Sequence, residues 1–80
     1  MDAVQLAAAA SDTSTPVHGL RSVASLRALV ESLELRQVEE ALRLGESWST
    51  IAAALGVTRQ AVHKKYAKRL SHVDPIERGQ

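Results

Sequence analysis

The sequence predicts an all-α fold, and three observations support this prediction. Residues 22–44 contain neither glycine nor proline, and apolar side chains recur there at intervals of three and four. Two shorter helical patterns follow, on either side of Gly56. The 80 residues include one Trp, one Tyr and no Phe, so the core has to be built from small aliphatic side chains. Together these features predict one small helical domain.

The first segment, residues 1–19, is expected to be a flexible arm. It consists of small and polar residues and is interrupted by Pro16 and Gly19. Its apolar run, VQLAAAA, has no basic residues before it and ends near Asp12, so a secretory signal is not favoured. No run approaches the ~20 apolar residues of a membrane helix. With no cysteine to indicate an oxidising compartment, the expected location is the cytoplasm.

The second segment, residues 22–44, predicts a long helix of about 34 Å at ~1.5 Å per residue. Its apolar series shifts phase between Leu33 and Leu35, so one kinked helix or two helices meeting there both fit; we favour one helix. Its later half, with Val38 and Leu42, is close in sequence to the next helix and should pack against it. Gly45 is expected to end the helix.

The earlier half of this helix predicts a homodimer, because little of the chain is left to cover its apolar stripe. Parallel and antiparallel pairing both fit, since the stripe is shorter than a typical parallel coiled coil. A monomer in which the stripe folds back on the chain's own helices is the alternative. The residues expected at the dimer interface are Val23, Leu26, Leu29, Val30 and Leu33.

The third segment, about residues 47–70, predicts two short helices that meet at a tight turn. Ser47 and Thr58 are expected as their N-caps, and Gly56 as the residue that lets the first helix end sharply. Ile51 and Leu55 should face inward, with Val57 filling the corner between the helices. In the second helix, the expected packing residues are Ala61, Val62 and Tyr66, and the expected outward residues are Arg59, Gln60, His63, Lys64 and Ala67.

The run W-S-T-I-A-A-A-L-G-V-T-R-Q-A-V-H-K-K-Y resembles a bacterial helix-turn-helix with the pattern W-x-x-I-A-x-x-L-G-V-[ST]-R-Q-A-V-H. The run is similar in this respect to sigma-factor region 4, resolvase C-terminal domains and small actinobacterial regulators. The match covers a quarter of the chain, or half with the preceding helix. It departs at Lys65, where the family has an apolar residue, and Tyr66 is expected to take over that packing role.

The resemblance implies sequence-specific binding of double-stranded DNA by a small transcriptional regulator, with the second helix, expected over residues 58–70, in the major groove. Residues 20–72 would form the DNA-binding domain and residues 73–80 a flexible tail. Base contacts are expected from Arg59, Gln60, His63 and Lys64, because Arg suits guanine and Gln suits adenine. Phosphate contacts are expected from Ser49, Thr50, Thr58, Lys65, Lys68 and Arg69.

Charge favours the same interpretation independently of the resemblance. Residues 58–72 hold five Lys and Arg side chains and no acid, although the formal net charge of the whole chain is only +1. The alternative is an ordinary basic helix end, since cations favour helix C-termini. Two further alternatives are architectural coating of DNA without base discrimination, and a protein-interaction or antitoxin-like adaptor. An adaptor could dock a basic partner through Glu31, Glu34, Glu39 and Glu40.

The remaining function classes are not favoured. The three histidines, His18, His63 and His72, match no metal-ligand spacing, and no nucleophile motif, phosphate-binding loop or paired acids occur. We therefore expect no enzyme activity, no catalytic residue, no metal and no cofactor. RNA binding is not favoured, because the sequence offers few of the aromatic side chains with which proteins stack on single-stranded RNA.

Overall fold

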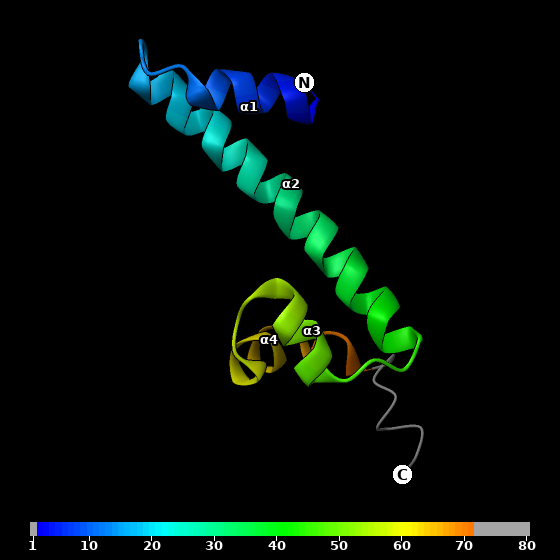
Figure 1. Ribbon diagram of the computed structural model, residues 1–80. Helices are drawn as coiled ribbons and strands as arrows, with labels where there is room; N and C mark the ends of the chain where they lie inside the picture. The colour runs from blue at the N-terminus through cyan, green and yellow to red at the C-terminus, as the bar shows by residue number, and fades with distance from the viewer. Residues whose placement is uncertain (1, 72–80) are drawn as a thin grey trace. The chain divides into compact units, whose positions relative to one another are not determined.

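A computed structural model describes residues 2–71, and this part of the chain contains four α-helices and no strand (Figure 1). The all-α prediction is confirmed. The helices are α1 (Ala3–Ser11), α2 (Pro16–Arg43), α3 (Trp48–Leu55) and α4 (Arg59–Tyr66). They belong to two compact units, an N-terminal unit of residues 1–35 and a C-terminal unit of residues 36–80. The tail predicted for residues 73–80 lies outside the described residues.

Helix α1 corrects the expectation of a flexible arm over residues 1–19. The carboxylate of Asp2 accepts a hydrogen bond from the backbone N–H of Gln5 at 2.8 Å, and the Gln5 side-chain oxygen accepts one from the N–H of Asp2 at 3.1 Å. This reciprocal capping box satisfies two amides that a helix start leaves free. Alanine, the strongest helix former, then fills most of the following positions. The small residues of this segment, which were expected to form an irregular arm, therefore form a capped helix.

Helix α2 begins at Pro16, earlier than predicted, because proline is suited to the first helical position. In the preceding turn, Asp12 accepts hydrogen bonds from the backbone N–H of Ser14 at 2.9 Å and from its hydroxyl at 2.6 Å. The side-chain hydrogen bond is the main reason that the pKa of Asp12 lies below its usual value. Gly19 permits a close approach to the end of α1, because a Cβ there would lie 3.2 Å from the Asp12 carbonyl oxygen.

Helix α2 continues without a break through Leu33–Leu35, so the prediction of a single long helix is confirmed and its second alternative is not. It ends at Arg43 and turns at Gly45, which has a φ of 90°. There the N–H of Glu46 donates to the carbonyl of Ala41 at 2.9 Å, and the N–H of Gly45 donates to Leu42 at 3.0 Å. These two bonds form a Schellman motif, which requires a left-handed residue and so favours glycine.

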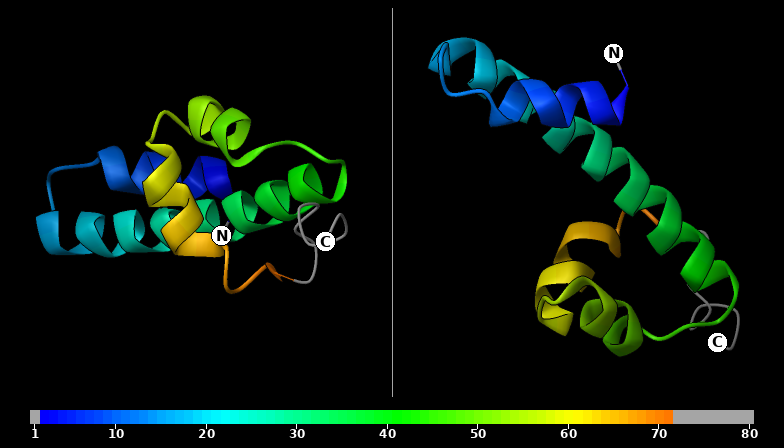
Figure 2. Two further views of the ribbon diagram at one scale, coloured as in Figure 1. Left: turned by 90° about the horizontal axis from the view of Figure 1, so that it is seen from below. Right: turned by 45° about the horizontal axis from the view of Figure 1, so that its top comes forward.

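The buried apolar core lies entirely in the C-terminal unit. It combines the last turns of α2 with α3, α4 and the turn after α4, and α3 and α4 lie against each other in both views of Figure 2. Its members are Val38, Leu42, Trp48, Ile51, Ala52, Val62, Tyr66 and Leu70. In the described part of the N-terminal unit, the buried residues are Gly19 and Ser22, and no large apolar side chain is fully covered.

Candidate nucleic-acid interface

Helix α3 starts where the sequence predicts, because Ser47 caps it. The Ser47 hydroxyl oxygen accepts a hydrogen bond from the N–H of Thr50 at 3.0 Å and donates one to the Thr50 hydroxyl at 3.0 Å. Trp48, Ile51 and Ala52 are buried on one side of the helix, while Ser49 and Thr50 are exposed on the other. The first turn of α3 therefore presents two hydroxyl groups to solvent.

The connection between α3 and α4 is a second Schellman turn. Gly56 has a φ of 72°, its N–H donates to Ala53 at 3.2 Å, and the N–H of Val57 donates to Ala52 at 3.0 Å. Two packing predictions fail here, because Leu55 is 39% exposed and Val57 is 47% exposed. Backbone hydrogen bonds stabilise this turn, so its shape does not require that Leu55 or Val57 be buried between the two helices.

Helix α4 is capped by Thr58, whose hydroxyl oxygen accepts a hydrogen bond from the N–H of Ala61 at 3.0 Å. Val62 and Tyr66 are buried, as predicted, whereas Ala61 is exposed and does not pack. The helix ends at Tyr66 and is followed by turns, so it is shorter than the helix expected over residues 58–70. Leu70, in those turns, is buried and was missed by the sequence analysis.

The ring of His63 contacts the ring of Trp48, which ties α4 to α3. The two ring centroids are 5.2 Å apart and the rings meet edge to face at 78°. His63 is half-buried, so the expectation that it points outward is not met. Trp48 is 2% exposed and therefore packs within the core of the C-terminal unit. Its buried Nε1 has no hydrogen-bond partner among the described residues.

The other predicted DNA-contact residues are exposed. Arg59 and Gln60 occupy the first turn of α4, and Lys64 lies one turn later. The Lys65 ammonium lies 5.2 Å from the centre of the Tyr66 ring, which is within the range of a cation–π interaction. The residues predicted to contact phosphate, all exposed, are Ser49, Thr50, Thr58, Lys65, Lys68 and Arg69.

The exposed Lys and Arg side chains of α4 and of the turns that follow it, residues 59–71, form what we call the basic surface. This segment carries no acidic side chain, whereas α2 carries several. Glu40, for example, forms an exposed ion pair with Arg43, with nitrogen-to-oxygen distances of 3.1 and 2.5 Å. The hydrogen bond from Arg43 lowers the pKa of Glu40, and the pKa of Arg43 is raised in return.

Comparison with protein-family models, curated proteins and solved structures finds no match to this chain. Its function must therefore be argued from its own residues.

Among residues 2–71, no group of three or more potential metal ligands comes together. None of the described helices is both long enough and apolar enough to span a membrane.

The residues predicted at a dimer interface lie along the N-terminal unit's part of α2. Val23, Leu26 and Leu29 are half-buried, while Val30 is 56% and Leu33 is 48% exposed. The stripe is therefore present and incompletely covered. The pairing of two chains along this stripe stays a prediction.

Proposed function

We propose that this chain binds double-stranded DNA in a sequence-specific manner, with α3 and α4 acting as a helix-turn-helix and α4 entering the major groove. One observation carries the proposal. Helix α4 buries Val62 and Tyr66 on one side while Arg59 and Gln60 stand exposed in its first turn. In helix-turn-helix proteins, the N-terminal residues of the second helix contact base edges. Arg and Gln are the side chains whose paired hydrogen bonds suit guanine and adenine.

The basic surface supports the same proposal through electrostatics. Lys64, Lys68 and Arg69 are exposed beyond the first turn of α4, with no acid in the segment to offset them. Each cation that neutralises a phosphate releases a counterion, which adds affinity that falls as salt rises. Ser49 and Thr50, at the start of α3, offer hydroxyl groups to a phosphate beside the helix N-terminus.

The contact between His63 and Trp48 supports a defined orientation of α4. Because the His63 ring meets Trp48 at a centroid distance of 5.2 Å, the rotation of α4 relative to α3 is tied to a specific aromatic contact. A helix that contacts base edges needs such a fixed orientation, since a small displacement breaks paired hydrogen bonds. We assign His63 a packing role first and a base contact second. A small transcriptional regulator acting at the nucleoid is the cellular role that this proposal implies.

Binding by substitution variants provides the test. The full chain is used to select fragments from a genomic DNA pool, and its affinity for the selected fragment and for random-sequence DNA is measured by anisotropy of labelled DNA. Arg59→Ala or Gln60→Ala should weaken binding to the selected fragment by about 1–3 kcal/mol, about 5- to 150-fold, with little effect on random DNA. Lys68→Ala should weaken binding to both and reduce the salt dependence.

Arg36→Ala is the matched control, because Arg36 is an exposed arginine of the same unit that lies on α2, outside the basic surface. This variant loses the same charge and should retain sequence preference. Equal losses on selected and random DNA for Arg59→Ala would favour the architectural alternative. If the wild-type chain binds no DNA at either of two salt concentrations, the proposal fails and an adaptor role through the acidic residues of α2 becomes the better explanation.

A further inference from the structure

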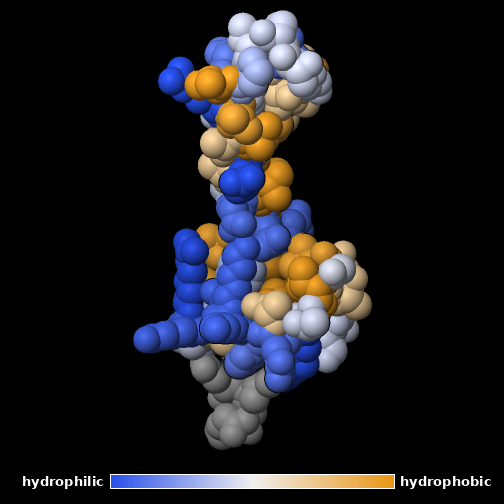
Figure 3. All heavy atoms as spheres, turned by 90° about the vertical axis from the view of Figure 1, so that its left-hand side faces the viewer, coloured by the Kyte–Doolittle hydropathy of each residue, from blue (hydrophilic) through white to orange (hydrophobic). Residues whose placement is uncertain are grey.

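The N-terminal unit lacks a core of its own. Helix α1 has nine residues and buries none of them, although its capping box is complete. A helix shorter than about 12–15 residues is marginal in water unless one of its faces packs against something. Figure 3 shows apolar residues reaching the surface in the upper part of the view, over α1 and the first turns of α2. This unit thus has well-formed helices whose apolar side chains are only partly covered.

The exposed apolar side chains follow one side of α2, at intervals of three and four. We call this surface the apolar stripe, and it consists of Leu20, Val23, Leu26, Val30 and Leu33. Leu20 is 65% exposed, Val30 and Leu33 remain about half exposed, and the other two are half-buried. Such spacing places all five within one arc of the helix surface. A stripe of this kind on a helix normally faces a partner.

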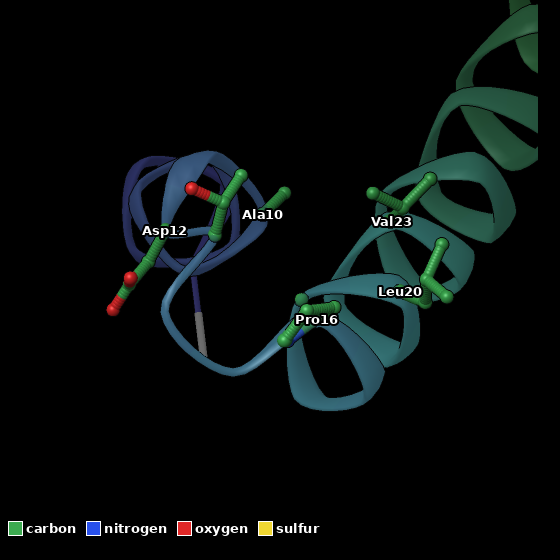
Figure 4. Close-up of a pocket in the computed structure, with 7 residues that line it drawn as sticks. Ala10, Asp12, Pro16, Leu20 and Val23 are labelled. Atoms are coloured by element: carbon green, nitrogen blue, oxygen red, sulfur yellow. The ribbon is translucent and has the colours of Figure 1, made fainter.

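An open hollow continues the apolar stripe between the end of α1 and the start of α2. Its volume is about 230 Å³, and Figure 4 shows Ala10 of α1 facing Leu20 and Val23 of α2 across it. Pro16 and Gly19 also line it, and the carboxylate of Asp12 points away from it in Figure 4. The lining is almost entirely apolar, so the hollow suits an aliphatic side chain rather than a polar ligand.

We propose that the apolar stripe and the hollow bind the same surface of a second copy of this chain, so that two α1–α2 hairpins form a four-helix arrangement. Leu20, Val30 and Leu33 are 65%, 56% and 48% exposed, so each has apolar area left for a partner to bury. A standard interface takes roughly 800 Å² from each partner, so α1 and the hollow beside the stripe would also take part in it.

Charge favours a second copy over a different protein. Residues 3–33, which include the whole stripe, carry two arginines and two acids beside His18, so their formal net charge is zero; they are Asp12, Arg21, Arg27 and Glu31. In a two-fold interface each group meets its own copy or a symmetry mate, so a surface with few charges avoids like-charge repulsion. A pair of chains would also carry two basic surfaces, which a palindromic DNA site can engage together. That last consequence rests on the proposed DNA binding, whereas the pairing itself does not.

The first experiment measures the mass of the full chain by sedimentation equilibrium over a dilution series without DNA. The wild-type chain should have twice the mass of one chain at high concentration. The double variant Val30→Glu and Leu33→Glu should have the mass of a single chain, because it places charge in the stripe. The matched control is Ala28→Glu with Ser32→Glu, two exposed positions on the opposite side of α2, and it should remain dimeric. A monomeric wild type, or a stripe variant that stays dimeric, would overturn the proposal.

Cysteine cross-linking keeps the proposal testable even if the charged variants unfold. The natural sequence has no cysteine, so Leu26→Cys introduces a single thiol into each chain near the middle of the apolar stripe, where the two copies come close in parallel or antiparallel pairing. Under mild oxidation this variant should form a disulfide-linked dimer rapidly, while Ala28→Cys should do so only slowly. Equal rates would contradict the proposed surface. Because neither experiment contains DNA, a failure here is distinct from a failure of the proposed function.

Discussion

Trp48 and His63 form an aromatic contact between α3 and α4 that was not predicted from the sequence. A helix was expected around each residue, but not their meeting. His63 falls at an outward position in the motif, and only the angle at which α4 crosses α3 brings its ring within 5.2 Å of Trp48. Such crossing angles arise from packing across the turn and are not encoded by the spacing within either helix.

His63→Ala should lower the free energy of unfolding of the C-terminal unit by about 0.5–1.5 kcal/mol, because it removes an edge-to-face aromatic contact. Urea denaturation followed by circular dichroism measures this change. Lys64→Ala is the control, since Lys64 is exposed on the same helix and its loss should change stability by less than about 0.5 kcal/mol. If Lys64→Ala destabilises the chain as much as His63→Ala, the contact has no special role.

His63→Phe separates packing from base contact. Phenylalanine can retain an edge-to-face contact with Trp48 but cannot donate a hydrogen bond. We expect this variant to keep both its stability and its preference for a selected DNA fragment, as measured by denaturation and by anisotropy. A stable variant that had lost its DNA preference would instead assign His63 a direct base contact.

At the scale of elements, the helix ends explain how the turn between α3 and α4 is specified. Gly56 has a φ of 72°, and a Cβ added there would meet no atom within 4 Å. The cost of a side chain at this position is therefore conformational rather than steric. Gly56→Ala should destabilise the unit by about 1–2 kcal/mol in thermal or urea unfolding. Ala54→Gly, at an exposed position of α3 two residues before Gly56, is a control for helix propensity alone.

The turn before α2 predicts a response to acid. Hydrogen bonds from Ser14 lower the pKa of Asp12 below 3.8, so the folded state favours the charged carboxylate more than the unfolded state does. This stabilisation is fully present above pH 3.8 and is lost as the pH falls through the lowered pKa. Thermal unfolding of wild type and Asp12→Asn should thus differ most near neutral pH and converge in acid. A difference that is unchanged in acid would contradict this role for Asp12.

The sequence was most informative where a local interaction decides the structure. Ser47, Thr58 and Gly56 carry recognisable capping roles, and α3 and α4 begin as expected. It was least informative for α1, where the capping box pairs Asp2 with Gln5 instead of the more familiar Ser or Thr with Glu. Pro16 was interpreted as an interruption although it begins a helix. Leu70 was missed although it continues the spacing of four from Val62 and Tyr66, and its N–H donates to the Tyr66 carbonyl at 2.8 Å; the expected packing residues stopped at Tyr66.

At the scale of the whole molecule, the two units differ in what stabilises them. The C-terminal unit has a buried core from three helices, whereas the N-terminal unit has none within its described residues. If a second chain covers the N-terminal unit, its stability depends on protein concentration, while that of the C-terminal unit depends on it less. Amide hydrogen exchange should then slow markedly in residues 16–35 as concentration rises, with little change in α3 and α4. Exchange in residues 16–35 that is independent of concentration would oppose this expectation.

Trp48 is the single tryptophan of the chain, and it lies at the start of α3 within the core of the C-terminal unit. Its intrinsic emission therefore reports on that unit alone, whereas the helical signal in circular dichroism comes from helices of both units. The two signals would coincide on heating only if the whole chain unfolds in one cooperative step. The gap between the two melting curves would give the energetic independence of the two units, without any added label.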